Sequence, residues 1–201
     1  MEDQIYSFVL RGNLAKVAMD RTQLLNKSHN SQYIDEEIAE HLSIDLLDEG
    51  HVIISKKMAS VYVAITSFEN MVRDFIAKTL SEVNGENWWE KCVSEKIRKK
   101  AESRKKEEEK IKWHQQRGDR LLNYTEMGDL NSIIVQNWEL FEDYLNTLEW
   151  AGQIISTLER SRNVIMHGGE LGNRDIERVG TNISCLLYTS PSPRDAHESR
   201  M

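Results

Sequence analysis

Residues 54–75 decide the fold of this chain, and they read ISKKMASVYVAITSFENMVRDF. The large apolar residues of this stretch recur at alternating intervals of four and three: Ile54, Met58, Val61, Ile65, Phe68, Val72 and Phe75. Such intervals place side chains on one face of an α-helix. The pattern therefore predicts a long helix that buries this face, and Asn84-Gly85 predicts its end.

The sequence on either side also favours helices, because both prolines of the chain lie beyond residue 190 and good helix formers are abundant. Asp48-Glu49-Gly50 predicts a break before the long helix. After it, the pattern predicts a helix that begins at Asp129 and continues to Leu145, a helix over 148–165 that Gly168-Gly169 stops, and a shorter one over 173–183. We therefore expect an all-α fold, an antiparallel helical bundle over 51–184 with an N-terminal helical extension over 1–50.

Composition restricts the classes of protein that the chain can represent. Its 201 residues carry a formal charge of −7, and no apolar run approaches the length of a membrane-spanning helix. The acidic start lacks the basic segment followed by an apolar segment that is typical of a signal peptide, so we expect a cytoplasmic protein without a membrane partner. Cys92 and Cys185 are too few for a disulfide framework or a zinc site.

The composition changes abruptly at Cys185. Residues 185–195 read CLLYTSPSPRD and contain both prolines. This string looks like the translation of a transposon-type sequencing adapter, so we interpret 185–201 as a disordered, non-native tail. A natural disordered terminus is the alternative.

One short motif stands out near the end of the helix predicted over 148–165. It reads Arg162-Asn163-Val-Ile-Met-His167, which puts Asn163 and His167 one turn apart on the same side, within reach of the long Arg162 side chain. An imidazole exchanges protons near neutral pH, and a guanidinium offers a rigid fork for two phosphate oxygens. Together these groups suit phosphodiester chemistry, with Gly168-Gly169 leaving room for a ligand. The alternative is structural: Arg162 bonds carbonyls at a helix end and His167 is a favourable cation in the last turn.

A run of basic residues precedes the motif, and it admits two interpretations. The cations could guide RNA phosphates, or they could form salt pairs on a solvated helix, because Glu102 and Glu107-Glu108-Glu109 interrupt them. The residues are Lys96, Arg98, Lys99, Lys100, Arg104, Lys105, Lys106, Lys110 and Lys112. No spacing of carboxylates or histidines defines a metal site, so we expect no metal and no cofactor.

The motif and the residues upstream of it resemble the HEPN superfamily of small helical domains. The upstream order is Gly85-Glu-Asn-Trp-Trp89 after a long apolar helix, then Gly128-Asp-Leu130, Ile133-Ile134, Asn137-Trp138 and Phe141. This order is similar to that of the Swt-type HEPN subfamily over roughly Val52 to Gly180. The first fifty residues stay outside the resemblance.

The resemblance implies a metal-independent endoribonuclease that acts as a homodimer, in antiphage defence, toxin-antitoxin systems or RNA processing. Arg162 and His167 would be the catalytic pair, and Asn163 would orient the imidazole or the phosphate. The implied partners are RNA, a second copy of the chain, and an antitoxin or regulatory protein. Two alternatives stay open: a non-catalytic HEPN module for RNA binding or dimerisation, and a helical adaptor that binds no nucleic acid.

Overall fold

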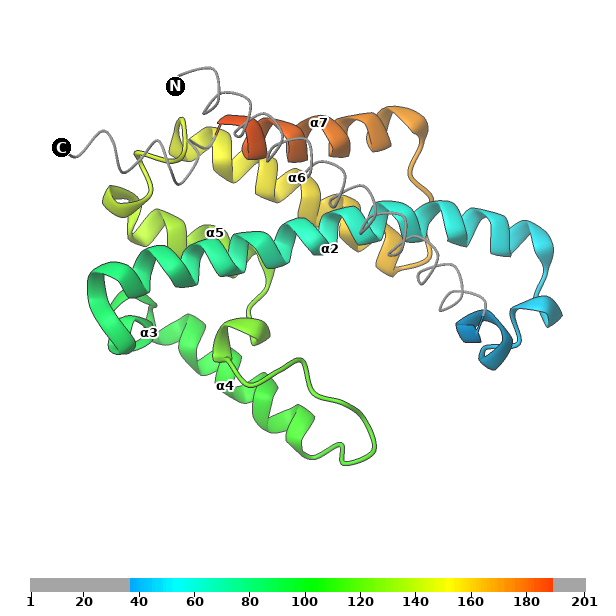
Figure 1. Ribbon diagram of the computed structural model, residues 1–201, viewed down its shortest axis with the longest axis horizontal. Coiled ribbons are helices and arrows are strands. Elements are labelled where there is room, and N and C mark those ends of the chain that lie inside the picture. The colour runs from blue at the N-terminus through cyan, green and yellow to red at the C-terminus, as the bar shows by residue number, and fades with distance from the viewer. Residues whose placement is uncertain (1–36, 190–201) are drawn as a thin grey trace, which may run out of the picture. The chain divides into compact units, whose positions relative to one another are not determined.

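The structure, a computed structural model, describes residues 37–189, and helices without any strand make up this part of the chain. The α-helices are α2 (Glu49–Asn84), α3 (Trp88–Cys92), α4 (Glu95–Glu109), α5 (Met127–Gln136), α6 (Leu148–Met166) and α7 (Asn173–Thr189), as Figure 1 shows. The described residues also form four 3-10 turns: η1 (Ile44–Leu46) before α2, and η2 (Gly85–Asn87), η3 (Leu121–Tyr124) and η4 (Trp138–Leu140) between the helices. The prediction of an all-α fold is confirmed. None of these helices combines the length and the apolar character needed to cross a bilayer.

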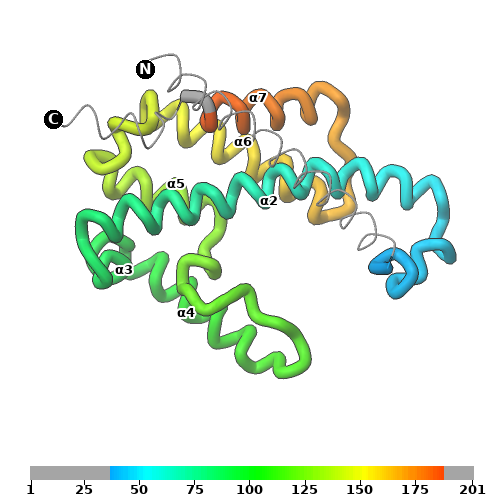
Figure 2. Tube along the Cα trace, viewed as in Figure 1, coloured from blue at the N-terminus to red at the C-terminus, as the bar shows by residue number. Residues whose placement is uncertain are grey.

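The chain divides between Ser55 and Lys56 into two compact units. The helices predicted before residue 37 lie outside the described residues. In the second unit α6 packs against α5 and against α7, and α2 runs alongside (Figure 2). These helices form an antiparallel bundle around one apolar core, in which α2 contributes Met58, Val61, Ile65, Phe68 and Val72. Burying each such side chain contributes about 1.5–3 kcal/mol.

The long helix predicted from residues 54–75 is confirmed, with one correction at its start. It begins at Glu49, so the break expected at Asp48-Glu49-Gly50 lies one residue earlier, where the Asp48 carboxylate accepts the His51 N–H at 3.1 Å. It continues beyond Phe75 to Asn84, where Gly85 with φ +66° ends it as predicted.

The helix predicted over 129–145 is shorter than the sequence suggested. It begins at Met127 because Glu126 is the N-cap, and Asp129 completes a capping box from the third helical position. It ends at Gln136 because the Asn137 side chain donates to the carbonyl oxygens of Ile133 (2.8 Å) and Cys92 (2.9 Å). An asparagine that bonds the backbone in this way competes with the helix, and the turn η4 follows.

Helix α4 is fastened to the segment that follows it. Arg104 donates to the Tyr124 carbonyl at 2.9 Å and forms ion pairs with Glu126 at 2.6 Å and with Asp129 at 3.3 Å. Tyr124 itself is fully buried, and its hydroxyl donates to the Gly118 carbonyl at 3.0 Å. Side-chain bonds, rather than apolar contacts alone, therefore hold this charged helix in place.

The final helix is longer than predicted. It begins at Asn173 as expected, but it continues through Cys185 to Thr189. Leu186 is buried in the core, because it extends the helical spacing of Ile176, Val179 and Ile183. Residues 185–189 therefore differ from the unstructured tail that composition suggested, and residues 190–201 lie outside the described part of the chain.

Candidate functional site

The motif occupies the C-terminal end of α6, whose two ends are defined by local hydrogen bonds. At its start the Thr147 hydroxyl accepts the Trp150 N–H at 3.2 Å. At its end Gly168, with φ +75°, donates to the Ile165 carbonyl at 3.0 Å, and Gly169 donates to the Val164 carbonyl at 2.8 Å. This pair of bonds is a Schellman motif, so the two glycines have a structural role in stopping the helix directly after His167.

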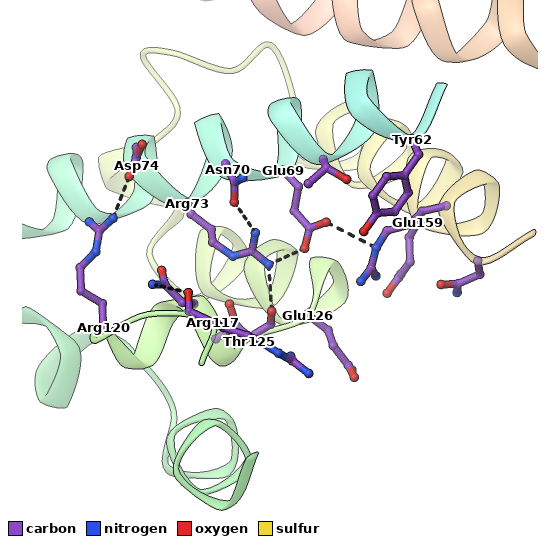
Figure 3. Close-up of a pocket in the computed structure, with 14 residues that line it drawn as sticks. Tyr62, Glu69, Asn70, Arg73, Asp74, Arg117, Arg120, Thr125, Glu126 and Glu159 are labelled. Atoms are coloured by element: carbon purple, nitrogen blue, oxygen red, sulfur yellow. Dashed lines mark hydrogen bonds and ion pairs between the residues drawn. The ribbon is translucent and has the colours of Figure 1, made fainter. Parts of the chain in front are cut away.

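A polar cavity of about 840 Å³ opens between α2, α6 and the segment before α5 (Figure 3). Arg162 and Asn163 both line it. The other lining residues are Tyr62, Thr66, Glu69, Asn70, Arg73, Asp74, Arg117, Arg120, Asn123, Thr125, Glu126 and Glu159. A cavity of this size with convergent polar groups is a candidate ligand site.

Arg162 lies beside an ion pair that the sequence analysis missed. Its Nε is 3.7 Å from Oε2 of Glu69, while Oε1 of Glu69 accepts a hydrogen bond from Nη2 of Arg73. Arg73 also donates to the Thr125 carbonyl and to the Asn70 side chain, each at 3.0 Å (Figure 3). One carboxylate thus bridges two guanidinium groups that come from different helices.

Glu69 is only 4% exposed, although it is charged. Its position in the sequence offered a signal, because it follows Phe68 and lies one turn beyond Ile65, on the edge of the apolar face of the long helix. An acidic residue on a face that enters the core requires a cationic partner.

His167 occupies a different place from Arg162. It is the C-cap residue of α6, it is exposed, and its backbone N–H donates to the Asn163 carbonyl at 3.1 Å. It does not line the cavity that contains Arg162 and Asn163. Within one copy of the chain, the cavity therefore contains Arg162 and Asn163 but not His167.

Three of the nine residues in the basic run form salt pairs with carboxylates of the described residues. Lys99 pairs with Glu95 at 2.7 Å, Lys100 pairs with Asp129 at 3.5 Å, and Arg104 holds two carboxylates. None of the basic residues singled out between Lys96 and Lys112 lines the cavity. Between residues 37 and 189, no three His, Cys, Asp or Glu side chains gather in a way that could hold a metal ion.

A bundle of antiparallel helices with an Arg-Asn-x3-His segment at the end of one of them defines a HEPN-type helical domain. Comparison with protein families gives the same result, since residues 64–189 match the Swt1-like HEPN family. This match covers more than half of the chain, and the chain therefore belongs to the Swt1-like HEPN family. It begins twelve residues later than the resemblance seen in the sequence and ends nine residues later, at the last residue of α7. Searches of the curated proteins and of the solved structures gave no match.

Proposed function

We propose that this HEPN domain is a metal-independent endoribonuclease that acts on RNA in the cytoplasm. The observation that carries the proposal is the setting of Arg162, which lines a polar cavity with Asn163 and whose Nε atom lies 3.7 Å from Oε2 of Glu69. Within the described residues, the ion pair with Glu69 is recorded at Nε and not at the terminal nitrogens of Arg162. A guanidinium whose terminal nitrogens are unoccupied can bind two phosphate oxygens at once.

In the proposed reaction the ribose 2′-oxygen attacks the adjacent phosphorus, so that an O2′–P bond forms while the P–O5′ bond breaks. Negative charge builds on the nonbridging oxygens, where Arg162 would stabilise it. One proton leaves the 2′-hydroxyl and one is delivered to the departing 5′-oxygen. His167 would transfer one of these protons, and Asn163 would orient the phosphate or the imidazole.

Because His167 lies outside the cavity of its own chain, the proposal includes a homodimer in which the two motifs face one another. His167 itself is exposed at the end of α6, where a second chain can reach it. Symmetric dimers are also the commonest oligomers.

The first prediction concerns the chemistry of cleavage. RNA should be cut in excess chelator to products with a cyclic phosphate, and an oligonucleotide with deoxyribose at the cut position should survive. Arg162→Lys should lower the rate by about a hundredfold to a thousandfold, because an ammonium cannot replace the two-pronged contact. His167→Ala should be similarly impaired, and Arg160→Lys, an exposed change on the same helix, should not be.

Electrophoresis of labelled oligonucleotides and mass spectrometry of the products measure these outcomes, and circular dichroism confirms that each variant is folded. Full activity in a variant that lacks both Arg162 and His167 would reject the proposal.

A non-catalytic HEPN module is the second candidate. The separation of His167 from the cavity favours it, as does the ion pair that already engages Arg162. This candidate predicts RNA binding or dimerisation without cleavage in the same assay.

A further inference from the structure

The buried carboxylate of Glu69 requires an explanation beyond packing. Glu69 is 4% exposed on a helix face that otherwise carries Ile65, Phe68 and Val72 into the core. Removing a carboxylate from water is costly, and replacing a buried ion pair by apolar residues is often neutral or stabilising. Stability alone is therefore a weak reason for a charge at this position.

The two oxygens of Glu69 meet two different arginines. Oε1 accepts from Nη2 of Arg73, which lies one turn later on the same helix, and Oε2 faces Nε of Arg162 on α6 at 3.7 Å. Arg73 is fixed in turn by the Thr125 carbonyl and by Asn70, each at 3.0 Å. Arg73 thus binds one oxygen of the Glu69 carboxylate, and the other oxygen faces Arg162.

The atom of Arg162 that meets Glu69 decides what its guanidinium can still do. A guanidinium has a side edge that includes Nε and an end edge formed by its two terminal nitrogens. Glu69 lies at the side edge, so the end edge remains available to a ligand in the cavity that Arg162 lines. A carboxylate across the end edge would instead compete with a phosphate.

The charge balance agrees with this interpretation. One carboxylate between two guanidinium groups leaves a net charge of +1 on Glu69, Arg73 and Arg162. The whole lining of the cavity carries four arginines and four carboxylates, so this excess favours an anion beside Arg162 rather than throughout the cavity.

We propose that Glu69 is the positioning residue of Arg162, and that Arg73 holds the Glu69 carboxylate in the orientation that leaves the end edge of Arg162 open to a phosphate. This inference rests on the proposed ribonuclease function. Neither residue touches the substrate in this proposal, since both act through Arg162.

The test compares Glu69→Gln, which keeps the shape and removes the charge, with Arg73→Lys, which keeps the charge and removes the fork. Glu82→Gln is the matched control, because Glu82 lies on the same helix, does not line the cavity and forms an exposed ion pair with Lys78 at 4.0 Å. For RNA cleavage, kcat should fall by about tenfold to a hundredfold in both variants, because a misplaced group loses transition-state contacts. KM should change much less, and Glu82→Gln should behave as the wild type.

Coupling between the residues gives a second measurement. Combining Glu69→Gln with Arg162→Lys should cost little more than Arg162→Lys alone, because Glu69 acts through Arg162. Additive losses would mean that Glu69 acts independently of Arg162, and they would overturn the inference. Unchanged kcat in folded Glu69→Gln protein would overturn it as well, while leaving the ribonuclease proposal intact.

A third measurement does not depend on activity. The Nε–H resonance of Arg162, assigned by its loss in Arg162→Lys, should exchange slowly with water in the wild type and rapidly in Glu69→Gln. If the wild-type protein cuts no RNA, the ribonuclease proposal fails, and this resonance still decides whether Glu69 positions Arg162. Equal exchange in the two proteins would refute the positioning role even when Glu69→Gln proves less stable to heat.

Discussion

Tyr124 shows how strongly the environment of one residue can affect its ionisation. Its ring is fully buried, and burial raises the pKa of its hydroxyl above the ordinary value, with the nearby carboxylates Glu108 and Glu109 adding to the effect. The folded protein therefore keeps this proton at a pH where the unfolded chain releases it. Stability is linked to pH through that difference.

The second prediction follows from this linkage. The contribution of Tyr124 to the free energy of unfolding should not change with pH below the ordinary tyrosine pKa of about 10, and it should fall as the pH rises above that value. Urea titrations between pH 8 and 11 measure the change, and ultraviolet absorbance of tyrosinate follows the ionisation directly. Tyr124→Phe should be less stable at pH 8, because it loses the bond to Gly118, but its stability should fall less steeply above pH 10. An identical slope in the two proteins would contradict the assignment.

Residues differ in how far the sequence alone could place them. The sequence singled out Arg162, Asn163 and His167 as one candidate site, and the cavity is lined by Arg162 and Asn163. The roles of Glu69 and Arg73 could not be predicted, because their contacts reach Thr125 and Arg162, which are distant in the sequence. Spacing on one helix also could not show that His167, at the C-cap, leaves the cavity.

At the scale of a single element, the end of α6 depends on a glycine that has no room for a side chain. A side chain at Gly169 would place its Cβ 2.7 Å from Val164 Cγ1 and 2.9 Å from the Val164 carbonyl oxygen. The second of these contacts is with the backbone of the helix itself, so no rotation of a side chain relieves it.

The third prediction concerns this helix end. Gly169→Ala should lower the free energy of unfolding by about 1 kcal/mol or more, because it forces the last turn of α6 to shift. Gly180→Ala is the control, since Gly180 lies inside α7 with nothing within 4 Å of a Cβ, and alanine favours a helix interior by about 1 kcal/mol. Urea unfolding followed by circular dichroism should therefore move in opposite directions for the two changes. A shift of the same sign in both would show that the close contact at Gly169 is relieved cheaply.

Element boundaries were predictable where one strong signal sets them. Gly85 and Gly168 end their helices as the sequence indicated. The end of α5 was not predictable, because it depends on the bond from Asn137 to the distant Cys92 carbonyl. The prediction from composition also placed the end of α7 too early. Leu186 continues the apolar stripe of this helix, although the composition changes at Cys185.

For the whole molecule, the main question is whether two chains share a site. If Arg162 acts with His167 of a partner chain, mixtures of two inactive variants should regain function. A heterodimer of Arg162→Ala and His167→Ala chains contains one intact site, and random pairing of C2 dimers makes half of the mixture heterodimers.

The fourth prediction is therefore that mixing and re-pairing these two variants restores about a quarter of the wild-type cleavage rate. Each variant alone should stay inactive, and light scattering should report dimers in all samples. If the mixture stays inactive while dimers form, Arg162 and His167 act within one chain or not at all. Activity in a monomeric wild type would likewise reject a shared site.

The side-chain bonds between α4 and the segment after it also determine where the polypeptide can be interrupted. Residues 111–117 are all exposed, and Trp113 is 86% exposed. Arg104, which precedes these residues in the sequence, is bound to the Tyr124 carbonyl, Glu126 and Asp129, which follow them. A single protease cut after Lys112 would therefore separate the covalent chain while these bonds and the shared apolar core keep the two pieces associated. We therefore expect that two complementary fragments, 1–112 and 113–201, assemble when they are mixed.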